Sequence, residues 1–236
     1  MGYCLSATST PGKTLMITGA TGFIGKVMLE KLLRCCPDIL KIFLLVRPKS
    51  GIKASLRIEE ITSGILFDKV REAQPNFQSK LIPIESDLMD SDLGLKEEDI
   101  RTLQDETELV FHMAATVRFD EKLSLALHMN VQGTRKILEL SRGMKKLLRV
   151  FYPPPVDPYK ILDAVGWMSE DIVQELTPML LGKRPNTYTF TKALAEYVVK
   201  EEGKGLPICI TRRPIVGASE SNFPVSEVFK ACPKFW

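Results

Sequence analysis

A tyrosine and a lysine four residues apart, Tyr188 and Lys192, are the side chains of this sequence best suited to move a proton. They lie in the segment NTYTFTKALAEYVVKEE (186–202), which predicts a helix that ends at Gly203. Residues four apart share one face of a helix. A phenol is a poor acid–base group near neutral pH, but a nearby ammonium favours the phenolate and brings it into a useful range. Of the five tyrosines only Tyr188 has a lysine at this distance, so we predict a catalytic pair.

Near the N-terminus, the segment TLMITGATGFIG (Thr14–Gly25) has the pattern of a pyrophosphate site. A short apolar run predicts a buried strand, three glycines follow at a spacing of three, and an apolar-periodic helix comes next. Glycine lets the backbone turn tightly and approach phosphates closely, and a helix N-terminus offers free N–H groups. We predict a dinucleotide site, although the spacing is GxxGxxG and not the usual GxGxxG. Its predicted residues are Thr18, Gly19, Thr21, Gly22, Phe23, Ile24 and Gly25.

The second predicted strand, IFLLV (42–46), ends in basic residues. In nucleotide-binding folds of this kind, an acidic residue near this position binds the ribose 2′-OH of NAD, whereas basic residues suit a 2′-phosphate. Here the chain continues as Arg47-Pro48-Lys49, without an acid. We therefore predict NADP(H) as cofactor, with Arg47 and Lys49 beside the phosphate. The alternative is a pair of solvated charges on a loop.

Two later predicted strands end in residues that would complete such a site. The strand over 81–84 leads to an aspartate at the position where an adenine should lie. The strand over 109–113 opens into small residues, which would let a nicotinamide ribose come close to the backbone, although simple tight packing is compatible with them too. The predicted residues are Asp87, Leu88, Ala114, Ala115 and Thr116, with Lys192 as a further candidate to hold the ribose.

Strands and helices alternate along the whole chain, which predicts a doubly wound, mostly parallel α/β sheet of the Rossmann type. This arrangement would bring the strand ends named above to one edge of the sheet. Beyond the elements already given, we expect helices up to Arg34, over 52–70, 97–103 and 121–144, and within 161–176 before Pro178, and strands over 147–152 and 208–211.

The composition is that of a globular protein with one substantial core: 236 residues, 44% hydrophobic and 26% charged. A net charge of +3, with no basic stripe interleaved with aromatics, excludes a nucleic-acid partner. The five cysteines form no CxxC pair, which favours a reduced, intracellular protein. Neither His112 nor His128 has a neighbouring ligand set, so we predict no metal site. No apolar run approaches the length of a membrane span.

Taken together, these segments resemble the extended short-chain dehydrogenase/reductases, and more closely the animal alcohol-forming fatty acyl-CoA reductases. The resemblance spans Thr14 to Ser219 and is carried by TGATGFIGKVMLEKLLR, FLLVRPKSG, FHMAATVRFDE, YPPPVDP, RPNTYTFTKALAEYVV and IVGAS. It implies reduction of long-chain acyl-CoA by two NADPH, through a bound aldehyde, to a fatty alcohol. It also implies that the three glycines hold the pyrophosphate, and that Tyr188 with Lys192 forms the catalytic pair.

The chain departs from the family pattern in three places. The family's fifth strand normally leads into a Ser-Thr-Ala-Tyr segment whose serine orients the carbonyl oxygen, but here RVFYPPP (149–155) lacks it. Losing one oxyanion donor typically costs ~10²–10³ in rate. An Arg-Pro-Ser pattern is replaced by Arg-Arg-Pro at 212–214, and residues 220–236 do not resemble the family. We expect a truncated or alternatively spliced form, with one NADP-binding domain over 1–236, a flexible segment 1–12 and a divergent tail.

Three functions therefore stay open. The first is an NADPH-dependent acyl-CoA reductase, and the second is an impaired nucleotide-binding fragment that lacks the serine and the acyl pocket. The third is another extended reductase or epimerase, acting on a nucleotide sugar or a ketone, which FHMAATVRF and RPNTYTFTKALAEY disfavour. The missing serine favours the second function, and the resemblance favours the first.

Location and assembly are less constrained by the sequence. The resemblance implies the cytosolic face of the peroxisomal membrane, whereas this chain judged alone predicts a cytosolic protein. Residues 1–6 match the N-myristoylation pattern, although the bulky Tyr3 argues against it. Acyl-chain preference and oligomeric state are left open.

Overall fold

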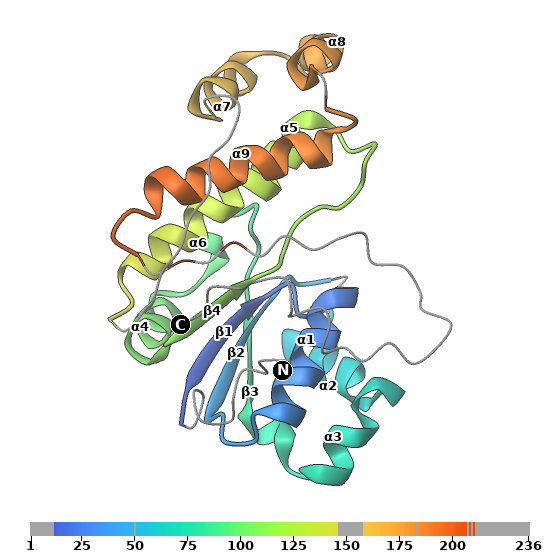
Figure 1. Ribbon diagram of the computed structural model, residues 1–236, viewed down its shortest axis with the longest axis vertical. Helices are drawn as coiled ribbons and strands as arrows, with labels where there is room; N and C mark the ends of the chain where they lie inside the picture. The colour runs from blue at the N-terminus through green and yellow to red at the C-terminus, as the bar shows by residue number, and fades with distance from the viewer. Residues whose placement is uncertain are drawn as a thin grey trace, which may run out of the picture.

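The computed structural model describes residues 12–49, 51–145, 158–182 and 184–206, together with Ile208 and Ile210. Within these residues, four strands form one parallel sheet in the order β3-β2-β1-β4 (Figure 1). The chain begins in the middle of the sheet, moves outward to β3, and returns to the other side of β1 as β4. This order confirms the predicted doubly wound fold and leaves a topological switch point between β1 and β4. The strands are β1 (Thr14–Thr18), β2 (Lys41–Val46), β3 (Leu81–Glu85) and β4 (Leu109–His112).

Helices cover both faces of the sheet, which is why the strands are almost continuously apolar. Leu15 and Ile17 of β1 point to the face covered by α1 (Phe23–Cys35), α2 (Ala54–Ser63) and α3 (Asp68–Ala73). Between them, Met16 points to the opposite face, because successive side chains of a strand alternate. That second face packs on α4 (Glu97–Glu106) and α6 (Gly133–Arg142). Short 3₁₀ turns η1 (Ile65–Phe67), η2 (Phe77–Lys80) and η3 (Ser91–Gly94) join these elements.

An outer helical layer lies beyond the second face of the sheet. Its base is one helical column, made of α5 (Leu123–Leu127), a π-helical turn η4 (His128–Gln132) and α6. The helix α9 (Thr187–Glu202) lies alongside this column, and α7 (Pro158–Trp167) and α8 (Glu170–Leu181) lie farthest from the sheet (Figure 1). The layer has its own apolar cluster, in which Leu127, Val173, Phe190 and Leu194 are buried.

The predicted elements are largely confirmed, with two corrections. The helix predicted over 52–70 is interrupted at Gly64, where extended backbone (φ −68°, ψ 161°) separates α2 from η1 and α3. The region predicted to hold one helix that stops at Pro178 contains α7 and α8, and Pro178 lies inside α8. Proline fixes a φ that suits a helix, but at this position its missing N–H removes the hydrogen bond to the carbonyl of Gln174. The helix instead ends at Gly182, which has φ +56° and donates its amide to the carbonyl of Pro178 at 3.3 Å.

Several predictions fall outside the described residues. They include the flexible segment and acylation pattern before Gly12, the strand over 147–152 with the prolines after it, the Arg-Arg-Pro of 212–214 and the tail from 220. Of the strand predicted over 208–211, the two described residues, Ile208 and Ile210, are not in a strand. Over 12–49, 51–145, 158–182 and 184–206, no helix is both long and apolar enough to cross a bilayer.

Candidate active site

The turn between β1 and α1 follows a path that requires glycine at two positions. Gly19 has φ +77°, and a Cβ there would lie 2.7 Å from the amide nitrogen of Ala114. At Gly25, a Cβ would lie 2.1 Å from the carbonyl oxygen of Gly19. These contacts show that α1 packs tightly on the turn and that the turn packs tightly on the chain leaving β4. The first and third glycines of the pattern are therefore required by the fold itself.

The second glycine, Gly22, leaves the N-terminus of α1 open. As N-cap residue it makes no side-chain hydrogen bond, and the first turn of α1 contains no acidic residue. A Cβ at Gly22 would meet only the carbonyl oxygen of Gly19, at 3.4 Å. The amides and the positive dipole end of α1 are thus available to an anion, which fits the pyrophosphate of a dinucleotide. Around this opening, Thr21 and Ile24 are half-buried and Phe23 is 67% exposed.

The end of β2 presents basic side chains, as predicted for a 2′-phosphate site. Arg47 and Lys49 are both exposed. A third cation, Arg57 of α2, donates a hydrogen bond from its guanidinium to the carbonyl oxygen of Arg47. The sequence reasoning missed Arg57, because only the packing of α2 brings it to this strand end. The one feature of the sequence that could have pointed to Arg57 is its position as a basic residue early in the helix that follows the strand.

The loop after β3, predicted to face an adenine, is held by its own side chain and by α6. Asp87 accepts a hydrogen bond from the amide of Met89 at 3.0 Å. The ammonium of Lys136 donates to the carbonyl oxygens of Leu88 at 2.9 Å and Asp90 at 2.7 Å. The side chain of Leu88 is buried against Gly133 of α6. Leu88 can therefore face a nucleotide only through its backbone, whereas the half-buried Asp87 keeps part of its side chain accessible.

The segment after β4 is fixed from both sides. The amide of Ala114 donates to Thr18 Oγ1 at 3.2 Å, which ties this segment to the glycine turn. Further along, Asn130 Oδ1 accepts from the amide of Thr116 at 3.0 Å, and Asn130 Nδ2 donates to the Thr116 carbonyl at 3.2 Å. Asn130 lies in the π-helical turn and is fully buried, so its side-chain amide bonds within the protein, to the backbone of Thr116 and to the hydroxyl of Thr191. The half-buried Ala115 lies between these two anchors.

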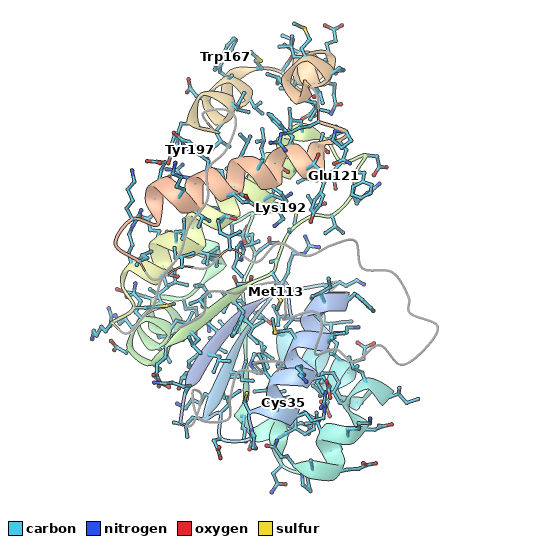
Figure 2. All side chains as sticks on the ribbon, in the orientation of Figure 1. Cys35, Met113, Glu121, Trp167, Lys192 and Tyr197 are labelled. Carbon is cyan, nitrogen blue, oxygen red and sulfur yellow. The ribbon has the colours of Figure 1, made fainter. Side chains whose placement is uncertain are left out.

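The predicted catalytic pair lies on α9, whose start is fixed by its own side chains. Asn186 caps the helix by accepting a hydrogen bond from the amide of Thr189 at 2.9 Å. The half-buried ring of Tyr188 packs at 45° against Phe119, with the centroids 5.9 Å apart. Lys192 projects from the side of α9 that faces the end of β4, where Met113 lies (Figure 2).

A half-buried histidine lies at the end of the sheet, within reach of the charge of Lys192. His112, the last residue of β4, has its Nδ1 2.7 Å from Thr18 Oγ1 and its Nε2 3.2 Å from Thr134 Oγ1. Desolvation of the enclosed imidazole, with the positive charge of Lys192 as the second cause, lowers the pKa of His112 to about 3. Lys192 is therefore close enough to the end of β4 for its charge to act there. The structure thus brings Lys192, one member of the predicted pair, close to the end of β4, which is hydrogen-bonded to Thr18 beside the glycine turn.

Comparison with known proteins agrees with this geometry. A family model described as "Male sterility protein", for an NAD-binding domain, matches residues 17–230. The chain belongs to the male sterility protein family. Its relatives include "Fatty acyl-CoA reductase 1" of Rattus norvegicus, 48% identical over 232 residues, and "Fatty acyl-CoA reductase 2" of Mus musculus, 43% identical over 231 residues. Each alignment covers 90% of this chain and 45% of the relative, so the chain spans about half the length of these relatives.

The fold of this member of the male sterility protein family also occurs in reductase domains of known structure. The terminal R domain of the myxalamid PKS-NRPS biosynthetic pathway superposes with a TM-score of 0.56 at 24% identity. The superposition covers 83% of this chain and 47% of that domain. This likeness supports the Rossmann-type architecture.

Proposed function

We propose that this protein reduces long-chain fatty acyl-CoA to fatty alcohol through a bound aldehyde, with NADPH as reductant. The observation that supports the proposal is that the charge of Lys192, one helical turn from Tyr188, acts on His112 at the end of β4, and that His112 is hydrogen-bonded to Thr18 beside the glycine turn. A nucleotide site and a proton donor at one edge are what a carbonyl reductase requires. The relatives named fatty acyl-CoA reductases support acyl-CoA as the substrate class.

The residues divide the work as follows. When bound, one NADPH would supply a hydride to the thioester carbonyl, whose C–S bond then breaks to release CoA thiol and leave the aldehyde, and a second NADPH would supply the hydride that reduces the aldehyde. Tyr188 donates a proton to the carbonyl oxygen as negative charge develops there. The Lys192 ammonium, one helical turn away, stabilises the phenolate that Tyr188 becomes. The exposed side chain of Phe119, which packs on Tyr188, and that of Val117, two residues earlier in the chain leaving β4, would offer apolar surface to an acyl chain.

The experiment that tests this proposal combines binding with turnover. Purified protein is titrated with NADPH and then incubated with NADPH and palmitoyl-CoA, and hexadecanol is quantified by gas chromatography. We expect both binding and alcohol. The Tyr188→Phe variant should bind NADPH normally and lose ~10²–10⁴ in rate. The matched control is Tyr197→Phe, the same change on the same helix, where the ring packs on Tyr159. Binding without alcohol in the wild type would contradict the proposal and support a nucleotide-binding fragment.

The preference for NADPH over NADH is proposed on the cations at the end of β2. Arg47, Lys49 and Arg57 provide the charge-assisted donors that a 2′-phosphate needs. Replacing Arg57 by alanine should raise the dissociation constant of NADPH about 10- to 100-fold and leave that of NADH unchanged. The control is Arg101→Ala, which removes an exposed arginine paired with Glu97 on α4. Equal effects on both nucleotides would contradict a role at the 2′-phosphate.

We also propose, from the family resemblance alone, that the protein works at the cytosolic face of the peroxisomal membrane. Co-localisation of a fluorescent fusion of the full-length protein with a peroxisomal marker tests this. Residues 1–236 are proposed to form a single NADP-binding domain, which a single cooperative unfolding transition that shifts with NADPH would support.

A further inference from the structure

A continuous chain of hydrogen bonds joins the glycine turn to the start of the helix that carries Tyr188. It crosses the protein from the sheet edge, through the π-helical turn η4, to α9. Apart from His112 itself, every member is at most 6% exposed. The members, in order, are Thr18, His112, Thr134, Asn130, Thr191 and the backbone of Thr187.

The hydrogen bonds of Thr18 determine whether Nδ1 of His112 is a donor or an acceptor. Thr18 Oγ1 accepts from the amides of Met113 and Ala114, each at 3.2 Å. The Met113 amide is shared with the Thr18 main-chain carbonyl, also at 3.2 Å, and together with the Ala114 amide it occupies the acceptor side of the hydroxyl, so the hydroxyl hydrogen is left to donate to His112 Nδ1 at 2.7 Å. His112 Nδ1 must therefore be an unprotonated acceptor.

The hydrogen bonds of Thr134 determine whether Nε2 of His112 is a donor or an acceptor. Thr134 Oγ1 donates to the carbonyl oxygen of Asn130 at 2.7 Å. Its only hydrogen is thereby used, so Thr134 must accept the bond of 3.2 Å from His112 Nε2. Both ends require the same form of the ring, with the proton on Nε2.

The neighbours of His112 also disfavour a charged ring. A second proton, on Nδ1, would point at the hydroxyl hydrogen of Thr18, and the Lys192 ammonium acts on the ring from α9. A neutral His112 adds no second positive charge beside Lys192.

We propose that His112 is a positioning residue, held as the neutral Nε2–H tautomer, that aligns the nucleotide-binding turn with the catalytic helix. Through Nδ1 it fixes the Thr18 hydroxyl and so the segment that carries Ala114. Through Nε2 it fixes η4, from which Asn130 donates to Thr191 at 3.0 Å. The two ring nitrogens therefore serve two functions, one for the cofactor and one for catalysis. The catalytic part of this inference depends on the proposed reductase function, whereas the tautomer and the cofactor part do not.

The tautomer can be read directly by ¹⁵N NMR of the full chain at neutral pH. The chain contains only two histidines, and a His128→Gln variant leaves the signals of His112 alone. We expect a pyridine-like Nδ1 and a pyrrole-like Nε2. A pyrrole-like Nδ1, or two protonated nitrogens, would overturn the proposal, whether or not the protein makes alcohol.

Two conservative variants separate the two functions. Asparagine at 112 retains an acceptor near Thr18 and loses the donor to Thr134, whereas glutamine retains the donor and loses the acceptor. His112→Asn should bind NADPH within about threefold of wild type and lower kcat about 5- to 10-fold. His112→Gln should raise the NADPH dissociation constant by about the same factor and change kcat less.

A purely structural role would give a different pattern. His112→Asn and His112→Gln would then lower the melting temperature without changing the NADPH dissociation constant or kcat, and this result would overturn the proposal. If wild type binds NADPH but makes no alcohol, the proposed function fails, while the tautomer and the NADPH affinities of both variants still decide whether His112 aligns the turn.

Discussion

The N-termini of α1 and α9 supply the two halves of the candidate site, and they are built in opposite ways. At α1 the cap is Gly22, which makes no side-chain hydrogen bond. At α9 the cap is Asn186, whose side-chain Oδ1 accepts a hydrogen bond from the main-chain amide of Thr189. The first turn of α1 thus keeps its amides free for a ligand, whereas at α9 the Asn186 side chain bonds the amide of Thr189.

The different caps of α1 and α9 fit the different roles proposed for their N-termini. The glycine turn is proposed to bind the pyrophosphate with backbone groups, so this part of the nucleotide half depends on the absence of side chains at three glycines. The catalytic half presents side chains, and these need a rigid helix start to be held in place. Thr187 adds to that rigidity by donating its hydroxyl to the carbonyls of Phe119 and Glu121, at 3.3 and 3.1 Å. Each half is therefore sensitive to a different kind of substitution.

The largest effect is expected from a methyl group at the closest backbone approach in the nucleotide half. In Gly25→Ala the new Cβ would meet the Gly19 carbonyl at 2.1 Å, so turn and helix must separate. We expect a loss of about 3 kcal/mol or more in the free energy of unfolding, and loss of NADPH binding. The matched control is Gly166→Ala, since Gly166 is also helical but has nothing within 4 Å of its Cβ position. Similar stability of both variants in urea denaturation would contradict the tight packing.

A carboxylate at the open cap should separate binding from stability. Gly22 has φ −77°, which aspartate adopts readily. In Gly22→Asp the side chain would cap α1 and occupy the amides that a phosphate needs, with like charge opposing the ligand. We expect a roughly 100-fold weaker NADPH affinity, about 2.7 kcal/mol, with stability unchanged or raised by a few tenths of a kcal/mol. Gly22→Ala adds bulk without charge, and should weaken binding much less in fluorescence titration.

Acid should weaken the junction between the two halves. Because the pKa of His112 is lowered to about 3, the unfolded chain takes up a proton that the native protein refuses. The stability contributed by the neutral ring is present above the unfolded pKa of about 6.5 and is lost as the pH falls toward 3. This one group should cost about 2 kcal/mol between pH 7 and pH 5. Urea denaturation of wild type and His112→Gln at both pH values measures this contribution to the free energy of unfolding. The contributions of carboxylates, which both proteins share, cancel in the difference. Parallel pH dependences would mean that His112 is not the group responsible.

The smallest effect is expected from removing the side-chain cap of α9. Asn186→Ala removes the acceptor for the Thr189 amide at the start of α9. We expect a loss of about 1 kcal/mol in the free energy of unfolding and little change in NADPH affinity. Asn186→Asp retains the acceptor and serves as the control in the same denaturation series. A weakened affinity for NADPH in the alanine variant would show that the two halves are more tightly coupled than their caps suggest.

Much of this architecture is legible in the sequence because it depends on local rules. The glycine spacing after an apolar strand predicts the turn, since only glycine permits a φ of +77° at Gly19 and a contact as close as that at Gly25. The alternation of strands and helices predicts the parallel sheet, and the spacing of Tyr188 and Lys192 places them on one helical face. The glycine turn and the Tyr188–Lys192 spacing depend on residues within a few positions of each other, and the alternation of strands and helices can be read along the chain without knowing which strands pair.

Only the tertiary structure decides which distant residues meet. Arg57 joins the basic end of β2 because α2 folds back over that strand end, and no spacing rule connects it to Arg47. His112 offers no sign of its role in the sequence, since its partners Thr18 and Thr134 are 94 and 22 residues away. Buried polar groups must find partners wherever the fold brings them, so their roles depend on the packing of whole elements. The sequence therefore determined the parts of this site, and packing across the sheet edge decided how they are connected.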